Sequence, residues 1–283
     1  MKDIYNEDFY NAQKDGSYKS ALQILTMINN IFPNINKVFD VGCGLGTWLK
    51  AWQDIKKDIS VFGIDGNNIS DNLFFIPRDC YRRVDLTQNY LDLFKLIGIN
   101  LENKIKPFDL VQSLEVAEHL DEKYSENFID ILVNLSDIVL FSAAIPYQWG
   151  TNHINCQPPE YWAKLFKNKG YVCFDILRAD IWENKNIEWW YRQNIMIYVC
   201  QDKIEMLNKM GFKECNPKYL IIPEYYEMLG KSEENLRDLV HRIQSHLSYR
   251  LAKALVKNPL IFPFKAFDIY KNWKKGGKNG NGI

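Results

Sequence analysis

Residues 37–48, KVFDVGCGLGTW, decide the fold of this chain. An apolar segment, 38–41, reads as a buried strand and runs into a turn, after which a helical pattern begins. The turn carries three glycines at alternate positions: Gly42, Gly44 and Gly46. Glycine has no Cβ, so the backbone can turn sharply there and approach a ligand closely. The next apolar segment, 60–64, ends in Asp65, where an acidic side chain can hold a ribose diol, so the sequence predicts a nucleoside pocket.

The spacing of the glycines separates two kinds of nucleotide site. The dinucleotide fingerprint GxGxxG would need glycine where Thr47 stands. The chain has instead a strand, the sequence GxGxG, a helix, a second strand and Asp, in this order. The segments VFDVGCGLGTW and VFGIDG thereby resemble motif I and the following acidic motif of class I S-adenosylmethionine-dependent methyltransferases. The resemblance implies S-adenosylmethionine as cofactor, held by the glycine turn and Asp65. The alternative is a glycine-rich loop that only turns the chain.

Strand and helix patterns alternate through the first two thirds of the chain. A helix is expected over 11–31, ahead of the first strand. We expect strands at 38–41, 60–64, 81–86, 108–114, 138–143, 171–177 and 195–200. Such alternation predicts an α/β fold with a doubly wound, mostly parallel sheet. The resemblance implies a Rossmann-like methyltransferase domain of seven strands, the last antiparallel, over residues 1–201.

Residues 202–283 are expected to form a helical carboxyl-terminal extension. An amphipathic helix is predicted from a cap at Ser232 to a stop before Pro259. Between His241 and Ile283 there are nine Lys or Arg against one acid, which makes a basic tail. This tail suits the surface of an anionic membrane or a glycan-assembly partner, but the apolar stripe serves equally well for packing on the body or in a homodimer. Nucleic acid is not expected as a partner, because basic residues are concentrated in the tail alone.

Composition limits the class of protein. The chain has 283 residues, 47% of them hydrophobic, and a formal net charge of zero, which excludes a disordered chain. Six cysteines without a CxxC pair and the lack of an apolar amino-terminal run predict reduced thiols and a cytoplasmic protein. No apolar run approaches the length of a transmembrane helix, so any membrane contact would be peripheral, at the inner face.

The fourth expected strand leads into a cluster of acids and histidine. Glu115, Glu118 and His119 follow it at spacing i, i+3, i+4, which places them on one face if a helix has begun there. His153 follows the fifth strand, on a loop at the same edge of the sheet. Two carboxylates and two imidazoles form a ligand set for Mg²⁺ or Mn²⁺. The alternatives are groups that only position cofactor or substrate, and His119 or His153 as a metal-free general base.

This cluster looks like the ExxEH-plus-distal-His set of small-RNA terminal-ribose O-methyltransferases, in which a metal grips a sugar diol. Glu115, Glu118 and His119 match that set well, whereas His153 matches only in order. The ExxEH part also resembles O-methyltransferases of quinone precursors. The resemblance implies catalytic roles for Glu115, His119 and His153.

Three other residues are assigned to cofactor binding. Asp85, after the third strand, resembles the acid that reads the adenine amino group in this superfamily. Tyr18, on the first helix, is expected to close over the cofactor, and Ser113 stands at the end of the fourth strand. Ordinary packing or a plain strand-end acid are the alternatives.

The segments FYNAQKDGSY, LEVAEHL, LFSAAIP and EWWYRQN are together similar to methyltransferases of bacterial surface-polysaccharide pathways, over about residues 5–200. That similarity implies O-methyl transfer to a sugar hydroxyl of a saccharide or lipid-linked glycan acceptor. The alternatives are a quinone-like or other small hydroxylated acceptor, and a non-catalytic cofactor-binding scaffold in a glycan-assembly complex.

Overall fold

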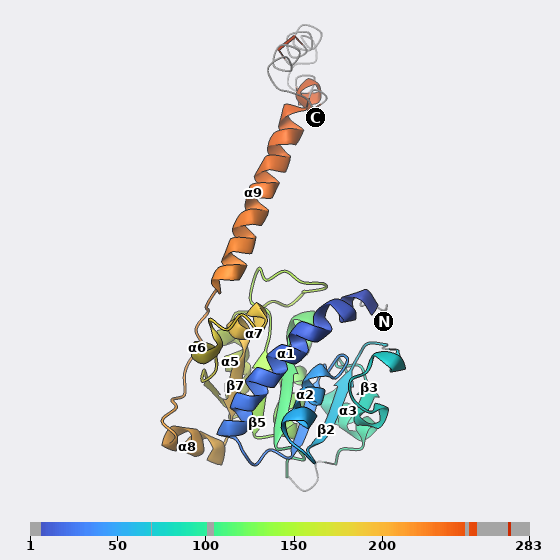
Figure 1. Ribbon diagram of the computed structural model, residues 1–283, viewed down its shortest axis with the longest axis vertical. Coiled ribbons are helices and arrows are strands. Elements are labelled where there is room, and N and C mark those ends of the chain that lie inside the picture. Colours follow the sequence, from blue (N-terminus) through green and yellow to red (C-terminus); the bar gives the residue numbers. More distant parts are fainter. Residues whose placement is uncertain (1–6, 69, 101–104, 247–248, 254–270, 273–283) are drawn as a thin grey trace. The chain divides into compact units, whose positions relative to one another are not determined.

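The computed structural model describes residues 7–68, 70–100, 105–246, 249–253 and 271–272. Within these ranges seven strands form one sheet in the order β3-β2-β1-β4-β5-β7-β6 (Figure 1). The strands are β1 Lys37–Val41, β2 Ser60–Asp65, β3 Tyr81–Arg83, β4 Leu110–Leu114, β5 Ile138–Ser142, β6 Val172–Phe174 and β7 Met196–Val199. The pairs among β1 to β5 are parallel, and β7 is antiparallel to both β5 and β6. The predicted α/β fold, with a doubly wound, mostly parallel sheet of seven strands, is confirmed.

Helices connect and cover the strands. They are α1 Glu7–Ile31, α2 Thr47–Ile55, α3 Tyr90–Ile97, α4 Ser125–Leu135, α5 Pro159–Asn168, α6 Arg178–Ile181, α7 Trp189–Asn194, α8 Asp202–Lys209 and α9 Pro223–Ser245. Short 3₁₀ turns lie at Asp71–Leu73, Arg78–Cys80, Ala117–His119 and Glu122–Tyr124.

The sheet is buried on both faces. Neighbouring strand residues such as Val38 and Phe39 point to opposite faces and belong to separate hydrophobic clusters. Side chains of α1, α2 and α6 to α8 fill one cluster, and those of α3, α4 and α5 fill the other. Both faces are therefore occupied by helices, and the loops at the carboxyl edge of the strands are left to form a site.

β3 and β6 are the strands that fall furthest short of their expected lengths. β3 ends at Arg83, which pairs with Asp65, the last residue of β2. β6 ends at Phe174, whose partner is Ile197. β7 starts at Met196, one residue further along that antiparallel pair. In each case the strand stops where its neighbour offers almost no further backbone to pair with.

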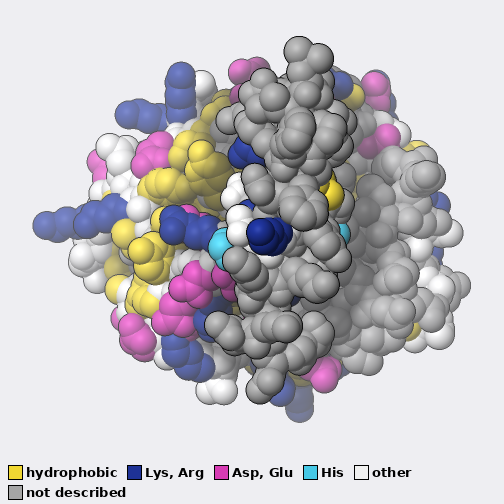
Figure 2. Space-filling model, turned by 90° about the horizontal axis from the view of Figure 1, so that it is seen from above, with side chains coloured by type: hydrophobic (Ala, Val, Ile, Leu, Met, Phe, Trp, Pro, Cys, Tyr) yellow, Lys and Arg dark blue, Asp and Glu magenta, His cyan; other side chains and the backbone are white. Residues whose placement is uncertain are grey.

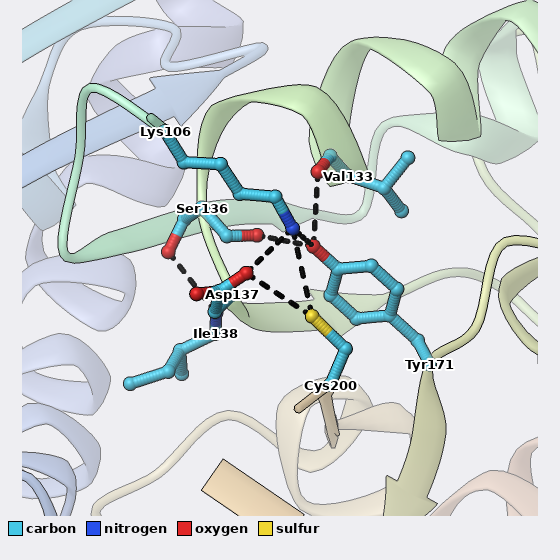
Figure 3. A network of polar contacts seen from close by, with 7 residues as sticks. All are labelled: Lys106, Val133, Ser136, Asp137, Ile138, Tyr171 and Cys200. Atoms are coloured by element: carbon cyan, nitrogen blue, oxygen red, sulfur yellow. Dashed lines mark hydrogen bonds and ion pairs between the residues drawn. The ribbon is translucent and has the colours of Figure 1, made fainter. Parts of the chain in front are cut away.

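The opposite, amino edge of the sheet is closed by a polar network around Lys106 (Figure 3). Its ammonium lies 2.6 Å from Asp137 Oδ1 and donates to Tyr171 Oη at 2.5 Å. The Cys200 thiol in turn donates to Asp137 Oδ1 at 3.1 Å. The residues come from the starts of β4, β5 and β6 and the end of β7, so the network ties these strand ends together.

The chain divides into two compact units, Met1–Ile222 and Pro223–Ile283. The division falls later than the expected boundary at residue 201, because Leu207 of α8 is buried in the core of the first unit. α9 begins at Pro223, ahead of the expected cap at Ser232, and proline is well suited to the first position of a helix.

α9 presents an exposed apolar stripe within the second unit: Leu236, Leu239, Val240 and Ile243. The predicted docking of this stripe stays a prediction, and most of the basic tail lies outside the described residues. Among the described helices, none combines the length and the apolar character that crossing a bilayer requires. On the face shown in Figure 2, acidic, basic and hydrophobic side chains are interspersed among the described residues.

Candidate active site

The glycine turn joins β1 to α2. All three of its glycines have positive φ: Gly42 at +83°, Gly44 at +53° and Gly46 at +80°. The amides of Gly42 and Cys43 donate to the Ile64 carbonyl at 2.7 and 3.0 Å, which holds the turn against the end of β2. A Cβ on Gly42 would lie 2.4 Å from Val116 Cγ2, so only glycine fits there.

Asp65 is buried and supports this turn directly. Its Oδ2 accepts from the Gly44 amide at 2.9 Å, and its Oδ1 accepts from the backbone and side-chain nitrogens of Asn67 at 2.8 and 2.9 Å. Burial raises the pKa of the carboxyl, against the effect of these donors. The predicted contact with a ribose diol stays a prediction.

Ser113 and Asp85 make contacts within the chain. The Ser113 hydroxyl is fully buried and donates to the Val41 carbonyl at 2.8 Å, which joins β4 to β1 just before the glycine turn. Asp85 Oδ1 accepts from the amide and the hydroxyl of Thr87 at 2.9 and 2.7 Å. Both residues stand at the predicted edge of the sheet, and their roles toward a cofactor stay predictions.

Tyr18 is placed differently from the expectation. Its hydroxyl donates to Asp54 Oδ2 at 2.6 Å, near the end of α2, whereas the glycine turn precedes the start of that helix. The neighbouring Ser17 reaches the start of α2 instead, where its Oγ lies 3.1 Å from Thr47 Oγ1 and 3.4 Å from Tyr191 Oη. Ser17 therefore lies beside the end of the turn, and no sequence pattern indicated this position. The predicted role of Tyr18 toward a cofactor stays a prediction.

Glu118, His119 and His153 converge at the carboxyl edge of β4 and β5. Among the described residues, one ligand atom of each lies within 4.8 Å of the others. The two imidazole rings are 4.9 Å apart between centroids, at 74°. A helical face does not produce this arrangement, because residues 117–119 form a single 3₁₀ turn. The loop after β5 brings His153 back instead, with the amides of Ile154 and Asn155 donating to the Glu118 carbonyl.

Backbone carbonyls orient both imidazoles. His119 Nδ1 lies 3.2 Å from the Asn152 carbonyl, and His153 Nδ1 lies 2.9 Å from the Gln148 carbonyl. A carbonyl only accepts, so Nδ1 carries the proton and Nε2 carries the lone pair, the arrangement typical of metal-binding histidines. Burial and the neighbouring His153 lower the pKa of His119 to about 4, and burial lowers that of His153. Both rings are therefore neutral at pH 7.

Glu118 is the least satisfied polar group of the cluster. Its side chain is 0% exposed, and within the described part of the chain neither carboxyl oxygen makes a hydrogen bond of acceptable geometry. Burial and the nearby charge of Glu115 raise its pKa well above the ordinary value. A buried carboxyl without donors fits a site for a cation, and together with the two neutral imidazoles it forms a donor set suited to a divalent metal.

Glu115 lies against Glu118 but outside the three-residue group. Its φ of +56° is rare for a residue with a side chain, and its carboxylate accepts from Asn194 Nδ2 at 3.1 Å and Gln148 Nε2 at 3.1 Å. Burial raises its pKa to about 7, opposed by these donors. Three of the four predicted ligands therefore converge, and amides hold the fourth.

Gln148 and Asn194 belong to the site, although no sequence pattern indicated them. Gln148 links the two halves of the site, because its side chain donates to Glu115 while its carbonyl orients His153. Its Oε1 accepts from Asn194 at 3.0 Å and from Gln193 at 3.2 Å. Amides at such positions carry no spacing signal, although Asn194 lies in the segment EWWYRQN that supported the resemblance.

A viral protein and several solved structures are similar to this chain. No protein-family model matches the sequence. A stretch of 191 residues is 25% identical to "Putative methyltransferase 235L" of Invertebrate iridescent virus 6. The match spans 64% of this chain and 65% of the viral protein, so a third of that protein has no counterpart in it.

The chain is also similar to solved structures. The methyltransferase domain of bacterial CtHen1-C is 18% identical, with 64% of this chain and 97% of that chain covered and a TM-score of 0.43. A SAM-dependent methyltransferase from Archaeoglobus fulgidus is 16% identical, with 69% and 100% covered and a TM-score of 0.45. The sheet order, the glycine turn held by Asp65 and the similarity to the viral protein are the three findings on which the function proposed below rests.

Proposed function

We propose that this chain is an O-methyltransferase that acts on a sugar hydroxyl of a glycan or glycan precursor, assisted by a divalent cation. The observation that carries the proposal is the convergence of Glu118, His119 and His153 at the carboxyl edge of the sheet. The glycine turn stands at the same edge, one strand away, because β1 pairs with β4. Cofactor and acceptor hydroxyl would meet between them.

The glycine turn fits S-adenosylmethionine. Its backbone carries no Cβ at three positions, and Asp65 keeps the Gly44 amide in place while standing at the end of the neighbouring strand. When bound, the cofactor supplies a methyl group already activated by the positive sulfonium. The chain then has to place an acceptor oxygen in line with that methyl, and no covalent protein intermediate is needed.

The three converging residues offer one carboxylate and two imidazoles, a set that suits Mn²⁺ better than Mg²⁺, which prefers oxygen ligands. Glu118 would contribute a carboxylate oxygen, and His119 and His153 would each contribute Nε2, with Nδ1 held by a backbone carbonyl. A bound cation supplies Lewis acidity, which favours the deprotonated form of an alcohol whose pKa lies far above 7. Glu115 and Gln148 act behind this set, because they contact Glu118 and orient His153 respectively.

Transfer of a labelled methyl group tests the proposal. Purified protein with labelled S-adenosylmethionine should methylate members of a panel of neutral saccharides and lipid-linked oligosaccharides, and not quinone precursors or RNA. A chelator should abolish this transfer, and added Mg²⁺ or Mn²⁺ should restore it. Transfer only to quinone precursors or RNA would overturn the sugar assignment, and full activity in excess chelator would overturn the cation.

A further inference from the structure

A pocket of about 410 Å³ lies in the loop that follows β5, between residues 147 and 156. His153 is part of its lining, so the pocket opens onto the candidate cation site. Its volume falls in the range of small-molecule sites, about 300 to 1,000 Å³. An acceptor bound here would have its reacting hydroxyl close to His153.

Two large aromatic side chains of this loop are turned toward solvent. Trp149 is 66% exposed and Tyr147 is 81% exposed, and both line the pocket. The backbone of Tyr147 has a φ of +67°, a strained conformation for a residue with a side chain. Aromatic rings left out of the core on a strained loop suit a ligand that covers them.

The loop under these rings is firmly held. Gln148 lies between them in sequence, is buried, and accepts from the Ile145 amide and from Asn194 through Oε1. The Tyr219 hydroxyl donates to the Pro146 carbonyl at 3.3 Å. The platform is therefore in place before an acceptor arrives, which reduces the ordering that binding requires.

The side chains of the pocket offer no cationic group to a phosphate. None of the described residues that line it is Lys, Arg, Asp or Glu. Phosphate and carboxylate recognition relies on cationic donors, above all arginine.

What remains is a ligand with an apolar face and a polar, uncharged rim. We propose that Trp149 and Tyr147 form an acceptor platform for a neutral sugar ring, whose C–H face stacks on the aromatic surface while its hydroxyls point toward His153 and Gln148. This inference rests on the proposed function and narrows it: the methylated residue is an uncharged, unphosphorylated sugar.

Three variants test the platform: Trp149→Ala, Trp149→Phe and Tyr226→Ala. Tyr226, 71% exposed on α9, provides the matched control for loss of an exposed aromatic ring outside the pocket. Binding of methyl glycosides of neutral hexoses is followed by saturation-transfer NMR, and KM and kcat are measured with the accepted saccharide. Calorimetry with S-adenosylmethionine verifies that each variant is folded.

Trp149→Ala should raise KM and weaken glycoside binding about 3- to 10-fold, with kcat and cofactor affinity unchanged. Trp149→Phe should recover most of the loss, and Tyr226→Ala should behave as the wild type. Saccharide methylation with an unaltered KM in Trp149→Ala would overturn the platform and leave the proposed function standing. Preference for a phosphorylated sugar over its neutral counterpart would overturn the charge argument, and failure to methylate any saccharide would overturn the proposed function itself.

Discussion

Replacing Glu118 with methionine should stabilise the ligand-free protein while removing its response to metal. The carboxyl of Glu118 is fully buried, has no hydrogen bond of acceptable geometry in the described part of the chain, and faces Glu115. Methionine has a similar length and no polar atoms that need a partner, so it can fill the same space without this cost. The backbone carbonyl of residue 118, which accepts from Ile154 and Asn155, is unchanged by the substitution.

The expected size of the effect follows from the cost of an unsatisfied buried polar group, about 1 to 3 kcal/mol. In a domain of this size, each kcal/mol corresponds to roughly 2 to 4 °C, so Tm of the metal-free variant should rise by about 2 to 12 °C. For the wild type, Mn²⁺ at about 100 times its Kd should add about 2.7 kcal/mol. Glu118→Met should gain nothing from Mn²⁺, because it lacks one of three ligands.

Scanning calorimetry after dialysis against a chelator, with and without added Mn²⁺, measures both quantities. Glu122→Met is the control, since Glu122 is an exposed acid on the following 3₁₀ turn. It should change neither the Tm nor the metal response. A Glu118→Met protein that is less stable than the wild type without metal and still responds to Mn²⁺ would refute this account of the site.

Three further substitutions test other parts of the first unit. In Asp65→Asn, an amide that donates hydrogen bonds replaces a carboxylate that accepts them from the Gly44 and Asn67 amides. Affinity for S-adenosylmethionine should therefore fall about 10- to 100-fold in calorimetric titration. Burial raises the pKa of Asp40 to about 7 from 3.8, so the folded state binds this proton more tightly than the unfolded state. Stability should therefore fall as pH rises from about 4 to about 7, and urea unfolding at several pH values should show this slope reduced in Asp40→Asn. Gly150→Ala would place a Cβ 2.1 Å from His153 Nε2, so Mn²⁺ affinity should fall about 10- to 100-fold, whereas Gly230→Ala, with nothing within 4 Å, should leave it unchanged.

The fold could be predicted from the sequence because its signals are local and repeated. Apolar segments that end in glycine or acid marked the strands, and 38–41 and 60–64 fall within β1 and β2. The ends of the strands were predicted less accurately. A strand stops where its neighbour stops, and the sequence of one strand does not show where the neighbouring strand ends. The start of α9 was misplaced for a related reason: residues 226–228 are exposed, so no apolar stripe marks the first turns of this helix.

The candidate site was predicted in its residue types but not in its geometry. Glu118, His119 and His153 follow adjacent strands, and strand ends meet at one edge of a parallel sheet, so their convergence was foreseeable. The expectation that Glu115 shares a helical face with them is wrong in the structure, because Glu115 has a φ of +56° and no helix begins there. A left-handed residue other than glycine leaves no trace in the sequence. Gln148 was not predicted because its role depends on two contacts, one of its side chain with Glu115 and one of its carbonyl with His153. No regular spacing in the sequence indicates either contact.

Several unfavourable groups of the first unit lie at this one edge. Glu118 is buried and makes no side-chain hydrogen bond of acceptable geometry in the described part of the chain, Glu115 and Tyr147 have strained backbones, and Trp149 is left in solvent. Each feature costs free energy in the ligand-free chain, yet the surrounding residues, above all Gln148, hold them in place with well-formed hydrogen bonds. A site that only filled space would relax these contacts, since hydrophobic side chains of the same size would be more stable. Strain that is maintained by a fixed amide network is expected where ligands supply the missing partners: a cation for Glu118, and an uncharged ring for Trp149.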